Sequence, residues 1–178
     1  MKNDDLLRCC SQNDEPYIWY HPGDSFDGKV MPGREWHEMP CWIRDDMALD
    51  LKDLNAGMFE RVHLQAEIDD LLERASSGQL QEDGGFVRAP RDATRTHIDS
   101  EVIELRIREP FDVKGHRCRS RIYCFEPVDD RFSLVSLGSY VKQVDCARWR
   151  ELQDDFIRKC SRRKNKRRES FPLSRRPM

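Results

Sequence analysis

Alternation of apolar and polar residues predicts three β-strands in the second half of the chain. Residues 101–109 alternate in this way, residues 117–126 do so again, and residues 131–137 form a third apolar run. The positions that share the less polar face of the first two runs are Ile103, Leu105, Ile107, Cys118, Ser120, Ile122 and Cys124. Because only short linkers separate the runs, we expect an antiparallel meander with one face covered by helices.

A spacing of three and four residues predicts helices on both sides of these strands. Residues 58–77 carry one apolar stripe, and Gly78 follows at the position where helices commonly end. The stripe consists of Leu64, Ile68, Leu71, Leu72 and Ala75. A shorter helical pattern covers residues 45–54, and residues 146–160 show helical spacing again. We therefore predict an α+β fold in which two N-terminal helices pack on a small antiparallel sheet and a C-terminal helix follows.

The first 40 residues give few structural signals. Residues 17–20 are predicted to form a short strand, and residues 42–43 a second one. On this basis the chain divides into an N-terminal extension of unknown role (residues 1–40), a globular domain (residues 41–160) and a basic, flexible tail (residues 161–178).

Charge separates the two halves of the chain, although the net charge is only -2. Residues 1–100 contain 21 acidic and 11 basic residues, whereas residues 101–178 contain 12 acidic and 20 basic ones. Ten of these bases, with a single acid, lie within residues 158–176. Such asymmetry indicates contact of the basic half with a nucleic acid. The alternative is a solvated tail that attracts polyanions without specificity.

Composition disfavours several other classes of protein. No apolar run approaches the roughly 18–20 residues that a membrane span needs, and the acidic first ten residues do not resemble a signal peptide. The seven cysteines are irregularly spaced and include no C-x-x-C pair. We therefore expect a cytoplasmic protein with reduced thiols, no membrane contact, no metal ion and no other cofactor.

The polar face of the predicted sheet is rich in arginine and aromatic residues. These residues are Arg106, Arg108, Arg117, Arg119, Arg121, Tyr123 and Phe125. Neighbouring strands lie ~4.8 Å apart, and crowded like charges destabilise a sheet unless an anion or a carboxylate offsets them. Guanidinium groups suit phosphates and ring faces suit bases, so the face is typical of a single-stranded nucleic-acid site. The alternative is the ordinary solvated face of an antiparallel sheet.

Three segments resemble strands of the RelE/HigB toxins, small bacterial and phage proteins of the RelE/ParE superfamily. Residues 102–107 read VIELRI and contain the E-L-R strand of that family. Residues 119–125 read RSRIYCF, which is similar to its Y-R-x-x-Y-like strand. Residues 132–142 read FSLVSLGSYVK, which is similar to the strand that ends in G-F-x-K-K. The resemblance covers residues 41–160 and implies a RelE-like fold.

The resemblance implies a metal-independent messenger-RNA endonuclease that acts on the ribosome and is inhibited by a cognate antitoxin protein. In this reaction the RNA 2′-hydroxyl attacks the adjacent phosphate, which requires a base, cations and an acid. The residues implied as catalytic are Arg121, Tyr140 and Lys142. The candidate RNA-binding residues are Arg106, Arg108, Lys114, His116, Arg117, Arg119 and Tyr123.

Two alternatives stay open at this point. A non-catalytic protein of the same fold would be a gyrase-type toxin or a nucleic-acid-binding adaptor. Tyr140 would then serve as a packing residue at the end of a strand rather than as an acid.

Overall fold

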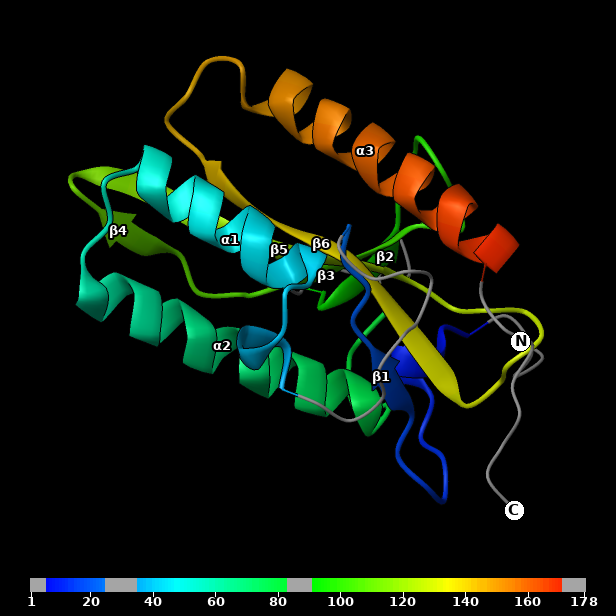
Figure 1. The fold of residues 1–178 in the computed structure, drawn as a ribbon. Helices are drawn as coiled ribbons and strands as arrows, with labels where there is room; N and C mark the ends of the chain where they lie inside the picture. Colours follow the sequence, from blue (N-terminus) through cyan, green and yellow to red (C-terminus); the bar gives the residue numbers. More distant parts are fainter. Residues whose placement is uncertain (1–5, 25–34, 83–90, 171–178) are drawn as a thin grey trace.

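A computed structural model of the chain describes residues 6–24, 35–82 and 91–170. Its elements are the short 3-10 helices η2 (Arg8–Cys10) and η3 (Trp36–Glu38), the helices α1 (Trp42–Asp53), α2 (Met58–Ser76) and α3 (Trp149–Ser170), and the strands β1 (Ile18–Tyr20), β2 (Ala93–Arg95), β3 (Ile103–Arg106), β4 (Phe111–Val113), β5 (His116–Phe125) and β6 (Ser133–Gln143). Figure 1 shows the sheet between α2 and α3. None of the helices in the described ranges has the length and apolar character that crossing a membrane requires.

The sheet is mixed and has six strands in the order β1-β6-β5-β3-β2, with β4 paired to β5. The prediction of an α+β fold is confirmed. The prediction of a purely antiparallel sheet is wrong, because β1 runs parallel to β6, with Ile18 opposite Ser133. A parallel pair needs a long crossover, and the helices and strands between β1 and β6 provide it.

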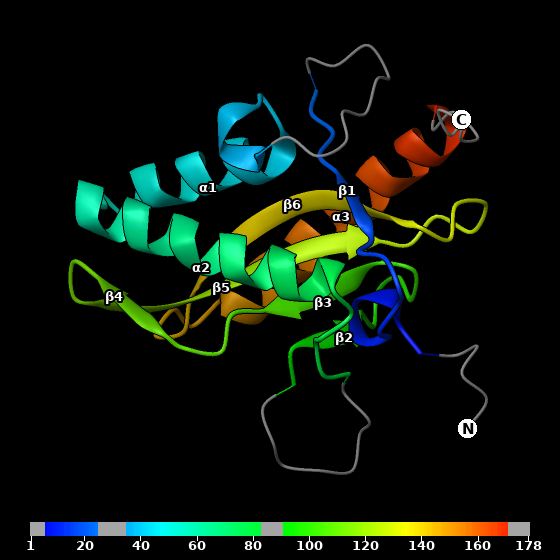
Figure 2. The same ribbon diagram turned by 90° about the horizontal axis from the view of Figure 1, so that it is seen from below.

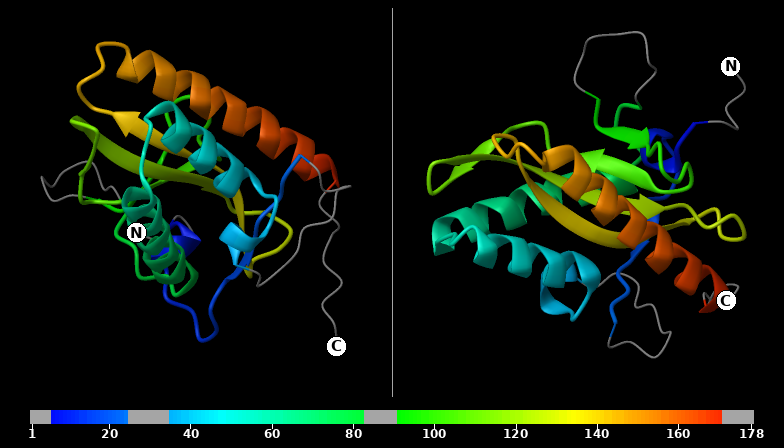
Figure 3. Two further views of the ribbon diagram at one scale, coloured as in Figure 1. Left: turned by 60° about the vertical axis from the view of Figure 1, so that its left-hand side comes forward. Right: turned by 90° about the horizontal axis from the view of Figure 1, so that it is seen from above.

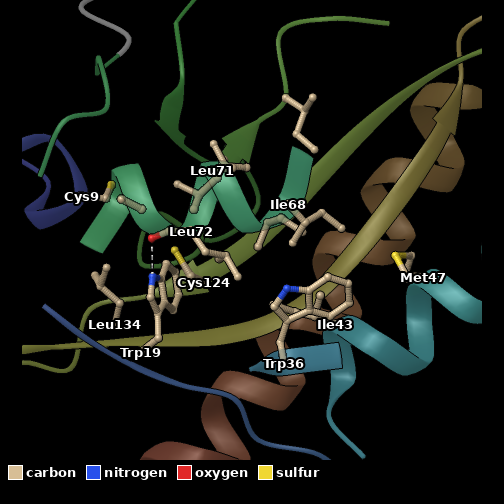
Figure 4. Close-up of a cluster of buried hydrophobic side chains, with 14 of the residues drawn as sticks. Cys9, Trp19, Trp36, Ile43, Met47, Ile68, Leu71, Leu72, Cys124 and Leu134 are labelled. Atoms are coloured by element: carbon tan, nitrogen blue, oxygen red, sulfur yellow. Dashed lines mark hydrogen bonds between the residues drawn. The ribbon is translucent and has the colours of Figure 1, made fainter. Parts of the chain in front are cut away.

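The face of the sheet that meets α1 and α2 forms the larger core, as the alternation predicted (Figure 2). Ile103, Leu105 and Ile107 belong to one buried cluster with Leu64 and Ile68 of α2. Figure 4 shows this core with α1, α2 and the N-terminal segment around it. The predicted helical stripe therefore packs on the predicted apolar strand face.

The N-terminal extension contributes to the same core. Leu7, Cys9, Trp19 and Trp36 are buried in it, and Trp19 Nε1 donates a hydrogen bond of 2.8 Å to the carbonyl oxygen of Leu72 (Figure 4). The described parts of residues 1–40 are thus integral to the domain. Apart from the strand predicted at residues 17–20, this contribution could not be predicted, because isolated apolar residues in loops carry no periodicity.

Several predicted boundaries differ from the structure. The strand β3 is shorter than the predicted run of residues 101–109, and β6 continues to Gln143, beyond the predicted end at residue 137. Trp42 and Ile43 begin α1 rather than forming a strand, because Ile43, Met47 and Leu51 bury one face of a continuous helix. The C-terminal helix, predicted to end at residue 160, continues to Ser170. Residues 161–170 are therefore helical instead of forming a flexible tail, and residues 171–178 lie outside the described ranges.

The helix α3 crosses the second face of the sheet (Figure 3). Tyr123 and Phe125 are buried in a smaller cluster with Ile157 and Cys160 of α3. The expectation that these two aromatic residues are exposed is therefore wrong, because α3 covers that half of the polar face. The other half, which holds the arginines, is only partly covered: Arg119 is exposed, whereas Arg121 is buried at the floor of a pocket.

Candidate functional site

A basic pocket of about 570 Å³ lies where the N-terminal half of α3 meets the sheet. Side chains from β2, β3, β5, β6 and α3 line it. Its basic residues are Arg91, Arg95, Arg106, Arg108, Arg119, Arg121, Lys142 and Arg150, and its acidic residues are Glu104 and Asp154. A cleft lined mainly by one sign of charge attracts ligands of the other sign. The pocket is therefore suited to an anion.

Glu104 organises the floor of the basic pocket. The register of β3 and β5 places Glu104 opposite Tyr123 and Arg106 opposite Arg121, so these four side chains share one face. The buried carboxylate accepts hydrogen bonds from Arg106 Nε at 2.8 Å and from Tyr123 Oη at 3.2 Å. It also accepts one of 2.7 Å from Gln153 Nε2 of α3. Glu104 thus ties the sheet to α3 beneath the pocket.

Arg121 is a buried guanidinium with spare hydrogen-bonding capacity. Only 7% of the residue is exposed, and its Nη1 donates a hydrogen bond of 2.9 Å to the carbonyl oxygen of Ser120. Its Nε lies 3.3 Å from a Glu104 oxygen but forms no hydrogen bond with any described residue. Burial lowers the pKa of Arg121, and the charge of Glu104 opposes that shift. Because Nε itself is buried against Glu104, a phosphate would bind the part of the guanidinium that lines the basic pocket.

Lys142 and Trp149 form the wall of the pocket next to Arg121. The Lys142 Nζ atom lies 3.3 Å from the centroid of the Trp149 ring, and β5–β6 register places Lys142 opposite Arg119. Burial, reinforced by the positive charge of Arg121, lowers the pKa of Lys142 to about 8. At neutral pH such a lysine carries its charge in most copies of the protein, yet it exchanges protons readily.

Five of the residues predicted from sequence line the basic pocket: Arg106, Arg108, Arg119, Arg121 and Lys142. These five residues differ in whether a nearby carboxylate neutralises their positive charge. Arg108 Nε lies 2.6 Å from the buried carboxylate of Asp92, whereas Arg119 is exposed and faces the pocket from β5.

The other predicted residues lie elsewhere. Tyr140 lines a different pocket, its ring stacks on Phe156 with centroids 5.2 Å apart, and burial raises its pKa to about 12. Tyr123 is too deeply buried to stack on a base. Lys114, His116 and Arg117 are exposed and do not line the basic pocket. Arg117 nevertheless lines a smaller hollow beside it, together with Arg119, Arg121 and Lys142. His116 Nδ1 lies 3.4 Å from Asp145.

Sequence reasoning missed the contributions of α3 and of the segment before β3. Trp149, Arg150 and Gln153 come from α3, and Arg91 and Arg95 come from the neighbourhood of β2. The helical periodicity of residues 146–160 predicted the helix that the structure shows as α3, but it did not indicate which face of the sheet the helix covers. The strand β2 spans three residues, which is too short for a detectable alternation.

Potential metal ligands gather away from this pocket. Glu35, His37 and Glu38 place one ligand atom each within 4.8 Å of one another. His37 Nε2 lies 2.9 Å from Glu35, an arrangement that an ion pair explains. No family model, curated protein or solved structure matches the chain.

Proposed function

We propose that the protein is a RelE/HigB-like toxin that cleaves messenger RNA on the ribosome and is inhibited by a cognate antitoxin. The observation that carries the proposal is the basic pocket, which the guanidinium of Arg121 lines together with Lys142 and Arg119.

The proposed reaction uses the RNA's own 2′-hydroxyl. Its oxygen attacks the phosphorus, the bond to the 5′-oxygen breaks, and a 2′,3′-cyclic phosphate and a 5′-hydroxyl result. Arg121 and Arg119 bind the phosphate oxygens, and their contacts strengthen as negative charge develops. Lys142 in its uncharged form accepts the 2′-hydroxyl proton.

The leaving 5′-oxygen needs a proton from a group in the same pocket. Tyr140 lies outside it, but His97 lines it and supplies an imidazole, the commonest general acid in proteins. The His97 Nε2 atom lies 3.3 Å from Asp154, which orients the ring. His97 therefore replaces Tyr140 as the proposed acid.

The test is RNA cleavage by the purified protein, with and without translating ribosomes, read by mapping the new 5′ ends. Arg121→Ala should reduce the cleavage rate by about 10²–10³-fold, as expected for loss of one electrostatic contact to the transition state. Arg121→Lys should rescue poorly, because a point charge does not replace a planar fork of donors. Arg131→Ala, in the exposed turn before β6, is the matched control. Intact RNA under both conditions would refute the nuclease.

A second function is favoured by the position of Tyr140 outside the basic pocket. A non-catalytic protein of the same fold, either a gyrase-type toxin or a nucleic-acid-binding adaptor, would use the pocket for binding only. RNA that is bound but left intact, with an affinity that Arg121→Ala lowers, would select this alternative.

A further inference from the structure

A second cavity, of about 390 Å³, adjoins the basic pocket. It lies among the C-terminal end of α1, the end of β6 and the start of α3, which converge in Figure 3. Its lining includes Asp50, Leu54, Tyr140, Trp149 and Leu152, and we call it the Asp50 pocket. Trp149 lines both cavities, so its side chain is their shared wall.

Asp53 and Gln143 also line this cavity, but Asp50 is the polar side chain that a hydrogen bond to the sheet holds in place. One of its oxygens, Oδ2, accepts a hydrogen bond of 2.8 Å from the backbone N–H of Val141. The other oxygen, Oδ1, accepts no hydrogen bond from the described residues. Burial, together with the charges of Asp46 and Asp53, raises the pKa of Asp50 to about 7. Donors brought by a ligand would therefore stabilise its carboxylate.

Aromatic rings complete the cavity. Tyr140 is held in place by its stacking on Phe156, and Trp149 is held by Lys142 over its face. Single-stranded RNA is recognised through bases that stack on aromatic side chains and form hydrogen bonds along their Watson–Crick edge. A cavity with two ring systems and one fixed acceptor matches this kind of ligand.

We propose that the Asp50 pocket binds the nucleobase next to the phosphate in the basic pocket, and that Asp50 selects guanine. This inference rests on the proposed function. An ionised carboxylate only accepts hydrogen bonds, and each of its oxygens has more than one lone pair. Guanine presents two adjacent N–H donors, at N1 and N2. On the same edge, adenine, cytosine and uracil each have a hydrogen-bond acceptor next to their donor. This acceptor would be repelled by the carboxylate oxygen that it faces.

The experiment compares short oligouridines that carry one central guanosine, adenosine, cytidine or uridine. All nucleotides are 2′-O-methylated, so that the RNA lacks its nucleophile and stays intact. Fluorescence anisotropy gives the dissociation constants. We expect the guanosine oligomer to bind about 10-fold more tightly than the uridine one, a difference of about 1.4 kcal/mol, which is within the usual range for a bidentate contact to a base.

Asp50→Asn tests the assignment directly. The amide offers one acceptor group and one donor group. The preference for guanosine should therefore disappear, and the oligomers with adenosine or cytidine should bind more tightly than they bind the wild-type protein. Its oxygen can still accept from Val141, and thermal denaturation verifies the fold. Asp45→Asn, an exposed position on the same helix, makes the same change in charge and should keep the guanosine preference.

The outcomes separate this inference from the proposed function. Equal binding of all four oligomers by the wild-type protein overturns the guanine site, whatever the variant does. If Arg121→Ala still weakens the binding of all four oligomers equally, the basic pocket binds RNA without selecting a base. If the wild-type protein binds none of them, both proposals fail.

Discussion

A buried ion pair between Asp46 of α1 and Arg163 of α3 holds α3 across the sheet. Arg163 donates two hydrogen bonds to the carboxylate, at 2.6 and 3.1 Å, and Lys159 donates a third at 2.9 Å. The Asp46 and Arg163 side chains are only 6% and 10% exposed. Arg163 Nη1 also donates to the carbonyl oxygen of Leu137 at 2.8 Å. Because α3 forms one wall of the basic pocket, this pair also defines the candidate site.

Replacing Asp46 with alanine should lower the free energy of unfolding by about 3–5 kcal/mol. The reason is that the Arg163 guanidinium would stay buried, with the Leu137 carbonyl but without its counter-ion. The double variant Asp46→Leu with Arg163→Met removes both charges and fills similar space, so it should recover most of that loss. Urea denaturation, read by circular dichroism, gives the midpoint and the slope for each variant.

The control for this experiment is the exposed pair between Asp155 and Arg158, which spans one turn of the same helix. These side chains are 62% and 53% exposed, and Asp155→Ala should change stability by less than about 0.5 kcal/mol. If Asp46→Ala costs no more than this control, the pair does not hold α3 on the sheet. If the double variant is as unstable as the single one, lost packing rather than an unpaired charge explains the effect.

Three further predictions test the core and the two pockets. Ile68→Ala should destabilise the protein by about 2–5 kcal/mol in the same assay, because Ile68 is fully buried between α2 and the sheet; a loss near zero would place α2 elsewhere. RNA affinity should fall as the pH rises through about 8, since Lys142 then loses its charge, and Lys142→Met should remove that step in an anisotropy titration. Asp50 has a folded-state pKa of about 7, above its ordinary value of 3.8, so the stability it contributes at low pH should be lost as the pH rises between these values. Denaturation of Asp50→Asn across that range should show a flatter profile, and an unchanged profile would contradict the shift.

Periodicity in the sequence predicted the elements that have one clean apolar face. The stripe of α2 appears as expected, and the predicted apolar face of β3 and β5 lies in the larger core. Burial does not alternate along these two strands, however, because much of their polar face is buried as well. The short strand predicted over residues 17–20 is confirmed as β1, Ile18–Tyr20, but the sequence did not indicate where it pairs, and it gave no signal for the residues around η2. Their buried side chains, such as Leu7 and Trp19, are placed by long-range contacts, and a few isolated apolar residues do not reveal which sheet edge they join.

The candidate site was predicted in part for the same reason. Arg106, Arg119 and Arg121 follow from strand alternation, and the structure places them in one pocket. Alternation assigns a residue to a face but does not say what covers that face. The position of α3 therefore separates Arg121, at the open end, from Tyr123, beneath the helix.

The charge asymmetry of the sequence has a structural explanation that changes its functional meaning. Asp46, Asp92 and Asp99, from the acidic half, pair with Arg163, Arg108 and Lys164, from the basic half, at distances of 2.6 Å. Glu101 also binds Lys164 and, at 2.6 Å, Arg168. Much of the basic segment thus serves to hold α3 in place, since buried charges need partners. Deleting residues 162–178 would therefore destabilise the fold as well as remove charge, and RNA binding is better tested at Arg119 and Arg121, where positive charge exceeds the carboxylates nearby.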